Sequence, residues 1–195
     1  MSKTRLEAFT DAVIAIVMTL LVLELDAPEE ASFAALWAMR YSFLIYMLSF
    51  LSLAVYWVNH HHLFQVAKKV SGGVLWYNLL FILFLTLYPF STAWVDKNLA
   101  QRVPELTYGV VALATNLSYF LLARKLAKVN GPDSQVAQAL KGYRKSKITL
   151  ALNVTGLLVG LWVPYVVIIL FVLSMLLWVV PERRIEALFL ENRKM

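Results

Sequence analysis

Long apolar runs separated by short polar segments dominate this chain. Six runs can be counted, covering roughly residues 8–25, 36–58, 74–95, 106–126, 148–163 and 165–180. A membrane-spanning helix needs about 20 mostly apolar residues, whereas shorter apolar stretches suffice for a soluble core. The pattern therefore predicts an all-α membrane protein in which residues 1–195 form a single domain with six transmembrane helices.

Two further features support these limits. The last two runs are short and meet at Pro164, and one continuous helix over residues 148–180 would be about 50 Å long, too long for a single crossing. Because proline interrupts a helix, we expect a tight hairpin of two spans. All six tryptophans also fall near ends of the runs, where amphipathic rings collect at the lipid headgroups: Trp37, Trp57, Trp76, Trp94, Trp162 and Trp178.

Composition and charge agree with a membrane location and set the orientation. Hydrophobic residues make up 61% of the chain and charged residues 15%, against about 45–50% and about 25% in soluble domains. The net charge of +6 comes from basic residues in short segments beside the apolar runs, which is typical of topology rather than of nucleic-acid binding. If both termini are cytoplasmic, the outer segments hold only Arg40, Lys97 and Arg102 of the basic residues. We expect a multi-pass integral membrane protein.

Candidate chemistry is sparse. The sequence has no cysteine, no phosphate-binding glycine loop and no nucleophile elbow. His60, His61 and His62 are consecutive, so on a helix they point about 100° apart and cannot all bind one metal ion. We therefore expect no enzyme activity, no cofactor and no metal site, and a hydrogen-bonding role for one of these histidines.

The first apolar run differs from the others because it contains an acid. Asp11 lies one turn inside it, and an ionisable group in lipid is costly unless it faces protein or water. On a helical wheel centred on Ile16, one stripe of residues falls within about 60° and Asp11 falls on the far side. The stripe contains Phe9, Ala12, Ile16, Thr19, Leu20 and Leu23. On an isolated helix such a stripe would face lipid.

Several other polar and small residues need an explanation. Glu24 and Asp26 lie at the outer end of the first run and either form an acidic outer mouth that concentrates cations or reflect the depletion of basic residues outside. Asn116 and Asn153 lie in mid-span, so each must find a partner on a neighbouring helix. Gly156 and Gly160 permit close helix packing, within or between subunits. The basic linker 127–147 is expected to contain a short surface helix over residues 134–145.

The segment Arg5-Leu6-Glu7-Ala8-Phe9-Thr10-Asp11-Ala12 closely resembles the R-x-x-x-F-S-D signature that opens the first helix of the transmembrane protein 175 family. This is the endolysosomal potassium channel family with its prokaryotic homologues. Threonine replaces serine at position 10 and keeps the hydroxyl. Further matches are found at Asn59, His60, Leu63, Phe64, Trp76, Asn78 and Pro89.

The resemblance implies a potassium-selective, leak-like channel that lacks a backbone-carbonyl filter. A one-repeat chain would form a homotetramer whose central pore is lined by the first helix of each subunit. The constriction would fall on Ile16, with Thr19 or Leu20 and then Leu23 towards the outside, which are residues of the same stripe. Potassium would be the main permeant ion, with caesium and protons as further candidates.

The signature residues would frame the pore helix. Arg5, Phe9, Thr10 and Asp11 would hold it in place, with Asp11 paired to His60 or Asn78 and with Trp76 nearby as a further support. The alternative function is a small secondary or proton-coupled transporter that uses Asp11 as its titrating group. A non-conducting membrane scaffold is the third.

Overall fold

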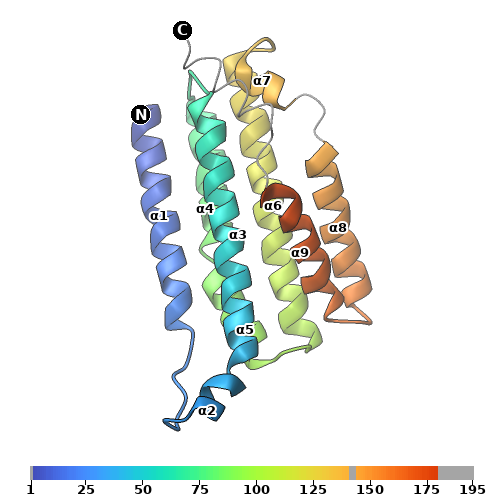
Figure 1. Cartoon of the computed structure of the whole chain (residues 1–195). Coiled ribbons are helices and arrows are strands. Elements are labelled where there is room, and N and C mark those ends of the chain that lie inside the picture. Colours follow the sequence, from blue (N-terminus) through green and yellow to red (C-terminus); the bar gives the residue numbers. More distant parts are fainter. Residues whose placement is uncertain (1, 141–143, 180–195) are drawn as a thin grey trace.

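The computed structural model describes residues 2–140 and 144–179, and within these ranges every regular element is an α-helix (Figure 1). Their bounds are α1 (Lys3–Leu23), α2 (Phe33–Ala38), α3 (Arg40–Gln65), α4 (Gly72–Leu85), α5 (Tyr88–Lys97), α6 (Arg102–Asn130), α7 (Gln135–Ala139), α8 (Arg144–Gly160) and α9 (Val166–Val179). The all-helical class is as predicted.

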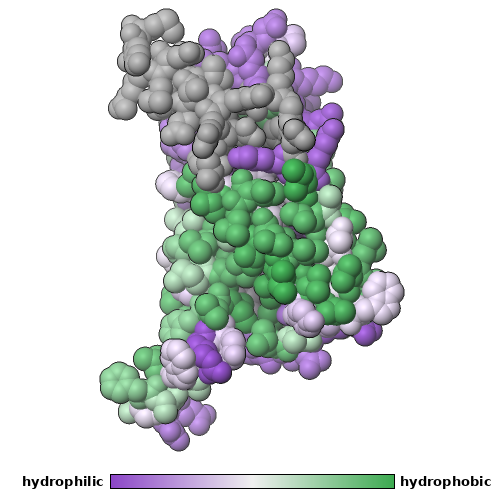
Figure 2. Space-filling model, turned by 45° about the vertical axis from the view of Figure 1, so that its right-hand side comes forward, coloured by the Kyte–Doolittle hydropathy of each residue, from purple (hydrophilic) through white to green (hydrophobic). Residues whose placement is uncertain are grey.

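Four segments of the described chain are long and apolar enough to cross a membrane. They are Lys3–Leu23, Arg40–Gln65, Gly72–Lys97 and Arg102–Asn130. In Figure 2 hydrophobic residues form a band around the middle of the visible face, and hydrophilic residues gather at both ends. This distribution is the one that a bilayer imposes on a bundle of helices. The chain is therefore an integral membrane protein.

The third predicted span is not one regular helix. Its backbone is interrupted between α4 and α5, where Leu87 N–H donates to the Phe84 carbonyl instead of following the i−4 pattern. Pro89 lies in the first turn of α5, where its missing N–H leaves no gap in the hydrogen-bond pattern. The two helices together still make one apolar segment. The proline thus sets the place of the interruption.

α8 and α9 pack against each other and are joined by residues 161–165, which include Pro164 (Figure 1). The contact is close because Val167 of α9 lies against Gly160 of α8 and Gly109 of α6. A Cβ on either glycine would collide with the Val167 side chain. The Gly156–Gly160 pair therefore packs within the subunit, which answers the question that the sequence left open. At 17 and 14 residues, the two helices are about 25 and about 21 Å long, so the count of six spans stays a prediction.

The start of α1, the 66–71 loop and the end of α6 lie at one end of the bundle. Lys3 Nζ donates to the Ala67 carbonyl at 3.0 Å. Asn130 Oδ1 accepts from the backbone N–H groups of Lys68 and Lys69 at 2.8 and 2.9 Å. These contacts bring together segments that the charge pattern assigns to the cytoplasmic side. The predicted surface helix over 134–145 is shorter than expected, because α7 ends at Ala139 and residues 144 and 145 already belong to α8.

Candidate functional site

The stripe predicted on the first helix is the uncovered face of α1. Phe9, Ile16, Leu20 and Leu23 are all exposed in the single chain, Ile16 by 57% and Leu23 by 75%, and Ala12 and Thr19 are exposed with them. The opposite face is buried through Leu6, Thr10, Ile14, Val17 and Leu21. α1 packs through that face against α3, α4 and α5. A helix with this arrangement holds its position in the subunit while offering an apolar face to something outside it.

A buried hydrogen-bond relay fixes α1 to α4 and α3. Asn78 Nδ2 donates to Thr10 Oγ1 at 2.8 Å, and Asn78 Oδ1 lies 2.9 Å from His60 Nε2. All three side chains are fully or almost fully buried. Because the Thr10 hydroxyl donates its own proton to the Leu6 carbonyl at 2.9 Å, it accepts from Asn78, and the proton on His60 then belongs on Nε2. The expected hydrogen-bonding histidine is thus His60.

Asp11 does not take part in this relay. Its Oδ1 accepts from Trp57 Nε1 at 3.0 Å, so the hydrogen-bond partner of Asp11 in the described chain is Trp57, and a pairing of Asp11 with His60 or Asn78 stays a prediction. Thr10, one residue earlier, is the residue of α1 that bonds to Asn78, because it lies in the contact between α1 and α4. Trp57 was interpreted as a membrane-interface anchor, but α3 continues to Gln65, about two turns beyond it. An indole N–H inside a span needs a hydrogen-bond acceptor. A tryptophan within a span, together with an acid on a neighbouring helix, is therefore the sequence feature that could have predicted this pair.

Arg5 and Trp76, which were also expected to frame α1, are peripheral, and Phe9 lies on the uncovered face of the helix. Trp76 exposes 75% of its surface, although the buried Asn78 is only two positions on. Arg5 lies exposed in the first turn of α1, next to the N-cap that Ser2 provides by accepting from the Arg5 N–H. Neither residue contacts the Thr10–Asn78–His60 relay through a hydrogen bond in the described part of the chain. The tight frame of α1 therefore consists of Thr10 and Asp11.

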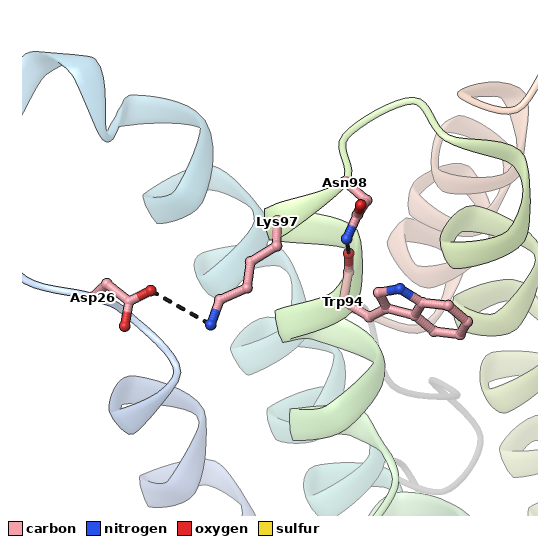
Figure 3. Close-up of polar contacts among 4 residues, drawn as sticks. All are labelled: Asp26, Trp94, Lys97 and Asn98. Atoms are coloured by element: carbon pink, nitrogen blue, oxygen red, sulfur yellow. Dashed lines mark hydrogen bonds and ion pairs between the residues drawn. The ribbon is translucent and has the colours of Figure 1, made fainter.

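At the other end of α1 the expected acidic residues lie close to a basic one. Glu24 is the C-cap of α1, and Asp26 follows in the loop. Lys97 Nζ lies 3.5 Å from Asp26 Oδ2, and beside it Asn98 Nδ2 donates to the Trp94 carbonyl (Figure 3). Both partners of the ion pair are largely exposed, so screening by water keeps the pair weak. Lys97 nevertheless offsets part of the negative charge at this end.

The described residues contain no group of three or more His, Asp or Glu side chains placed to hold a metal ion. His60 belongs to the relay. His61 lies beside Gln65 on its own helix, with 2.5 Å between His61 Nε2 and Gln65 Nε2.

Comparisons with known proteins point to a family. The family model described as endosomal/lysosomal potassium channel TMEM175 matches residues 5–89. A potassium channel of Chryseobacterium sp. is 38% identical over 192 residues, which are 98% of this chain and 100% of the other. The endosomal/lysosomal proton channel TMEM175 of Rattus norvegicus is 35% identical over 118 residues, 54% of this chain and 24% of the rat protein.

A solved structure extends the likeness to three dimensions. The lysosomal potassium-selective channel TMEM175 homolog from Chamaesiphon minutus superimposes with a TM-score of 0.67 at 29% sequence identity. The match covers 89% of this chain and 97% of that one. Together with the bacterial relative matched along its whole length, this places the chain in the TMEM175 family.

Proposed function

We propose that the chain is the subunit of a homotetrameric, potassium-selective cation channel in a prokaryotic plasma membrane, with six spans and both termini in the cytoplasm. Four copies of α1 would surround a central pore. The observation that carries this proposal is the uncovered face of α1, because the same helix is fixed from behind by a buried polar relay. The names of the relatives as potassium channels support the choice of ion.

The narrowest part of the pore would lie at Ile16. Four isoleucine side chains around an axis leave an apolar constriction that expels water, and a small outward movement of α1 would hydrate it. Leu20 and Leu23 would extend the apolar lining towards the outside. Potassium holds its hydration shell more weakly than sodium, so a narrow apolar ring penalises sodium more.

Thr19 is placed to assist the permeant ion. Its hydroxyl donates to the Ile16 carbonyl at 2.8 Å, and the side chain is otherwise exposed. Because the proton is committed to the backbone, the oxygen presents lone pairs to its surroundings and acts as an acceptor. A ring of four such oxygens would replace part of the ion's water shell. Such a site discriminates less than a carbonyl cage, so we expect a modest potassium preference with caesium and proton permeation.

The outer mouth would be only weakly acidic. Glu24 and Asp26 would attract cations to the external end of the pore, and Lys97 would reduce that effect through its ion pair with Asp26. The competing function, a transporter that titrates Asp11, predicts coupled and saturable transport rather than a conductance.

The test is potassium and sodium flux into liposomes that contain the purified protein. The comparison is between wild type, Ile16→Asn, and the control Leu158→Asn. The exposed fraction of Leu158, 58%, is similar to the 57% of Ile16. Leu158 lies on α8, however, which is far from α1 (Figure 1). We expect wild-type flux to favour potassium, Ile16→Asn to raise flux and reduce selectivity, and Leu158→Asn to resemble wild type.

The other outcomes point elsewhere. Flux unchanged by Ile16→Asn would move the constriction off this face of α1. Slow, saturable flux coupled to protons and abolished by Asp11→Asn would indicate the transporter, and no flux under any gradient would indicate a scaffold.

A further inference from the structure

A crevice opens on the side of the subunit between α6 and α8, away from α1. Its floor is formed by α3 and α9, and its empty volume is about 590 Å³ including the open side. Most of the lining is aromatic or aliphatic, and Leu117 and Leu150 are exposed at its edges. The crevice is lined by Tyr56, Asn59, Asn116, Leu117, Tyr119, Phe120, Ser146, Lys147, Thr149, Leu150 and Trp178. Ligand sites commonly combine such apolar walls with a few polar groups.

Asn116 is the polar group in this crevice whose partner is missing. Other mid-span asparagines are paired: Asn153 Nδ2 donates to Ser174 Oγ at 3.1 Å, and Asn59 Nδ2 donates to the Val55 carbonyl at 2.8 Å. Within residues 2–140 and 144–179, the Asn116 amide makes no hydrogen bond. An unpaired amide in an apolar setting is costly. The expectation that Asn116 bonds to a neighbouring helix is thus not met by the described part of the chain.

Several of the other polar groups of the crevice are already paired with one another or with backbone. Trp178 Nε1 donates to Thr149 Oγ1 at 2.7 Å. Tyr119 Oη donates to the Asn59 carbonyl at 3.0 Å. The Asn116 amide therefore lines a mostly apolar crevice without a hydrogen bond to any described residue. An acceptor brought by a ligand would satisfy it.

One cation lines this crevice, and a second stacks on one of its lining residues. Lys147 lines it from α8 and is exposed, and Arg124 of α6 stacks over the ring of Phe120 at 5.2 Å from the centroid. Neither forms an ion pair with another described residue. α8 carries no acid, and α6 carries none after Glu105. The charge at the rim is therefore positive and uncompensated by these helices.

We propose that this crevice binds an anionic phospholipid of the surrounding bilayer. One acyl chain lies along the apolar wall formed by Leu117, Phe120 and Leu150. An ester carbonyl accepts the hydrogen bond from Asn116 Nδ2, and the headgroup phosphate pairs with Lys147 and Arg124. The bound lipid thus supplies both the missing acceptor and the missing negative charge, while its apolar chain matches the rest of the lining.

The experiment measures lipid binding to the full-length protein by native mass spectrometry, with 1-palmitoyl-2-oleoyl-phosphatidylglycerol as the probe and the matching phosphatidylcholine for comparison. Three variants act on the crevice: Lys147→Gln removes the cation, Asn116→Leu removes the amide, and Leu150→Trp fills the space. Lys128→Gln is the matched control, since it removes one exposed charge from α6 without touching the crevice.

We expect wild type to retain phosphatidylglycerol over phosphatidylcholine and Lys147→Gln to bind it about fivefold more weakly, the change expected for one lysine acting on an anionic lipid. Asn116→Leu and Leu150→Trp weaken both lipids, and Lys128→Gln changes neither. Glycerol phosphate, which has the headgroup but no acyl chain, does not compete at the same concentration.

Opposite results overturn the proposal in distinct ways. Equal loss in Lys147→Gln and Lys128→Gln means that the attraction is general surface charge. Undiminished binding in Leu150→Trp means that the lipid lies elsewhere, and competition by glycerol phosphate assigns the site to a free anion.

Discussion

Thr10 and Asn78 lie across the contact between α1 and α4, with Asn78 Nδ2 donating to Thr10 Oγ1 at 2.8 Å in a fully buried setting. The same amide continues to His60, so one side chain joins three helices. A polar chain of this kind requires one relative position of the helices, because a shift would leave buried groups unpaired. The uncovered face of α1 is thereby fixed in direction as well as in place.

Thr10→Val should destabilise the subunit, because it keeps the shape of the side chain but leaves the Asn78 amide without its acceptor. Interhelical hydrogen bonds in membranes average about 0.6 kcal/mol and reach about 1.7 kcal/mol, so we expect a loss of about 1 kcal/mol. Equilibrium unfolding in detergent mixtures measures it. Thr10→Ser is the control and should remain close to wild type. A Thr10→Val protein as stable as wild type would show that the relay contributes nothing to stability.

Asp11→Ala should lower the yield of folded, assembled protein more than it changes ion selectivity, because Asp11 holds Trp57 and does not face the uncovered side of α1. Trp57→Phe should have a similar effect, and the double variant should lose little beyond either single one, since both remove the same contact. Size-exclusion yield and liposome flux give the two readouts. An assembled Asp11→Ala protein with an altered potassium-to-sodium ratio would contradict this role.

Gly160→Ala should destabilise the α8–α9 contact, because the added methyl group collides with Val167. Overpacking of this kind commonly costs about 1–3 kcal/mol. Combining it with Val167→Ala should recover part of the loss by making room. Thermal unfolding of the two single variants and the pair tests this coupling. Gly72→Ala is a suitable control, since a Cβ there meets open space. Strictly additive losses in the pair would rule out the contact.

Asn130→Ala should loosen the 66–71 loop. Asn130 accepts from the N–H groups of Lys68 and Lys69 and donates to the Lys69 carbonyl at 3.0 Å. Without these bonds the two backbone amides should exchange with solvent faster in hydrogen–deuterium exchange. Asn130→Asp keeps the acceptor and should preserve most of the protection. Unchanged exchange in Asn130→Ala would mean that the loop is held by other contacts.

The sequence by itself determined the class of the protein and the direction of α1. Apolar length is a one-dimensional property, so the membrane helices can be read directly from the chain, and helical periodicity put Ile16 and Leu23 on one face before any packing was known. The signature around Phe9 and Asp11 pointed to the family. Each of these depends only on neighbours along the chain.

The tertiary structure decided which polar groups meet. Asp11 pairs with Trp57 while Thr10 joins Asn78, and Gly160 packs against Val167 within the same subunit. Asn153 finds a partner on α9, whereas Asn116 faces a crevice. Positions one residue apart on a helix differ by about 100° in direction, and the rotation of each helix against its neighbours selects which side chain reaches across. That rotation is set by packing between segments far apart in the chain. A local sequence pattern therefore cannot predict it.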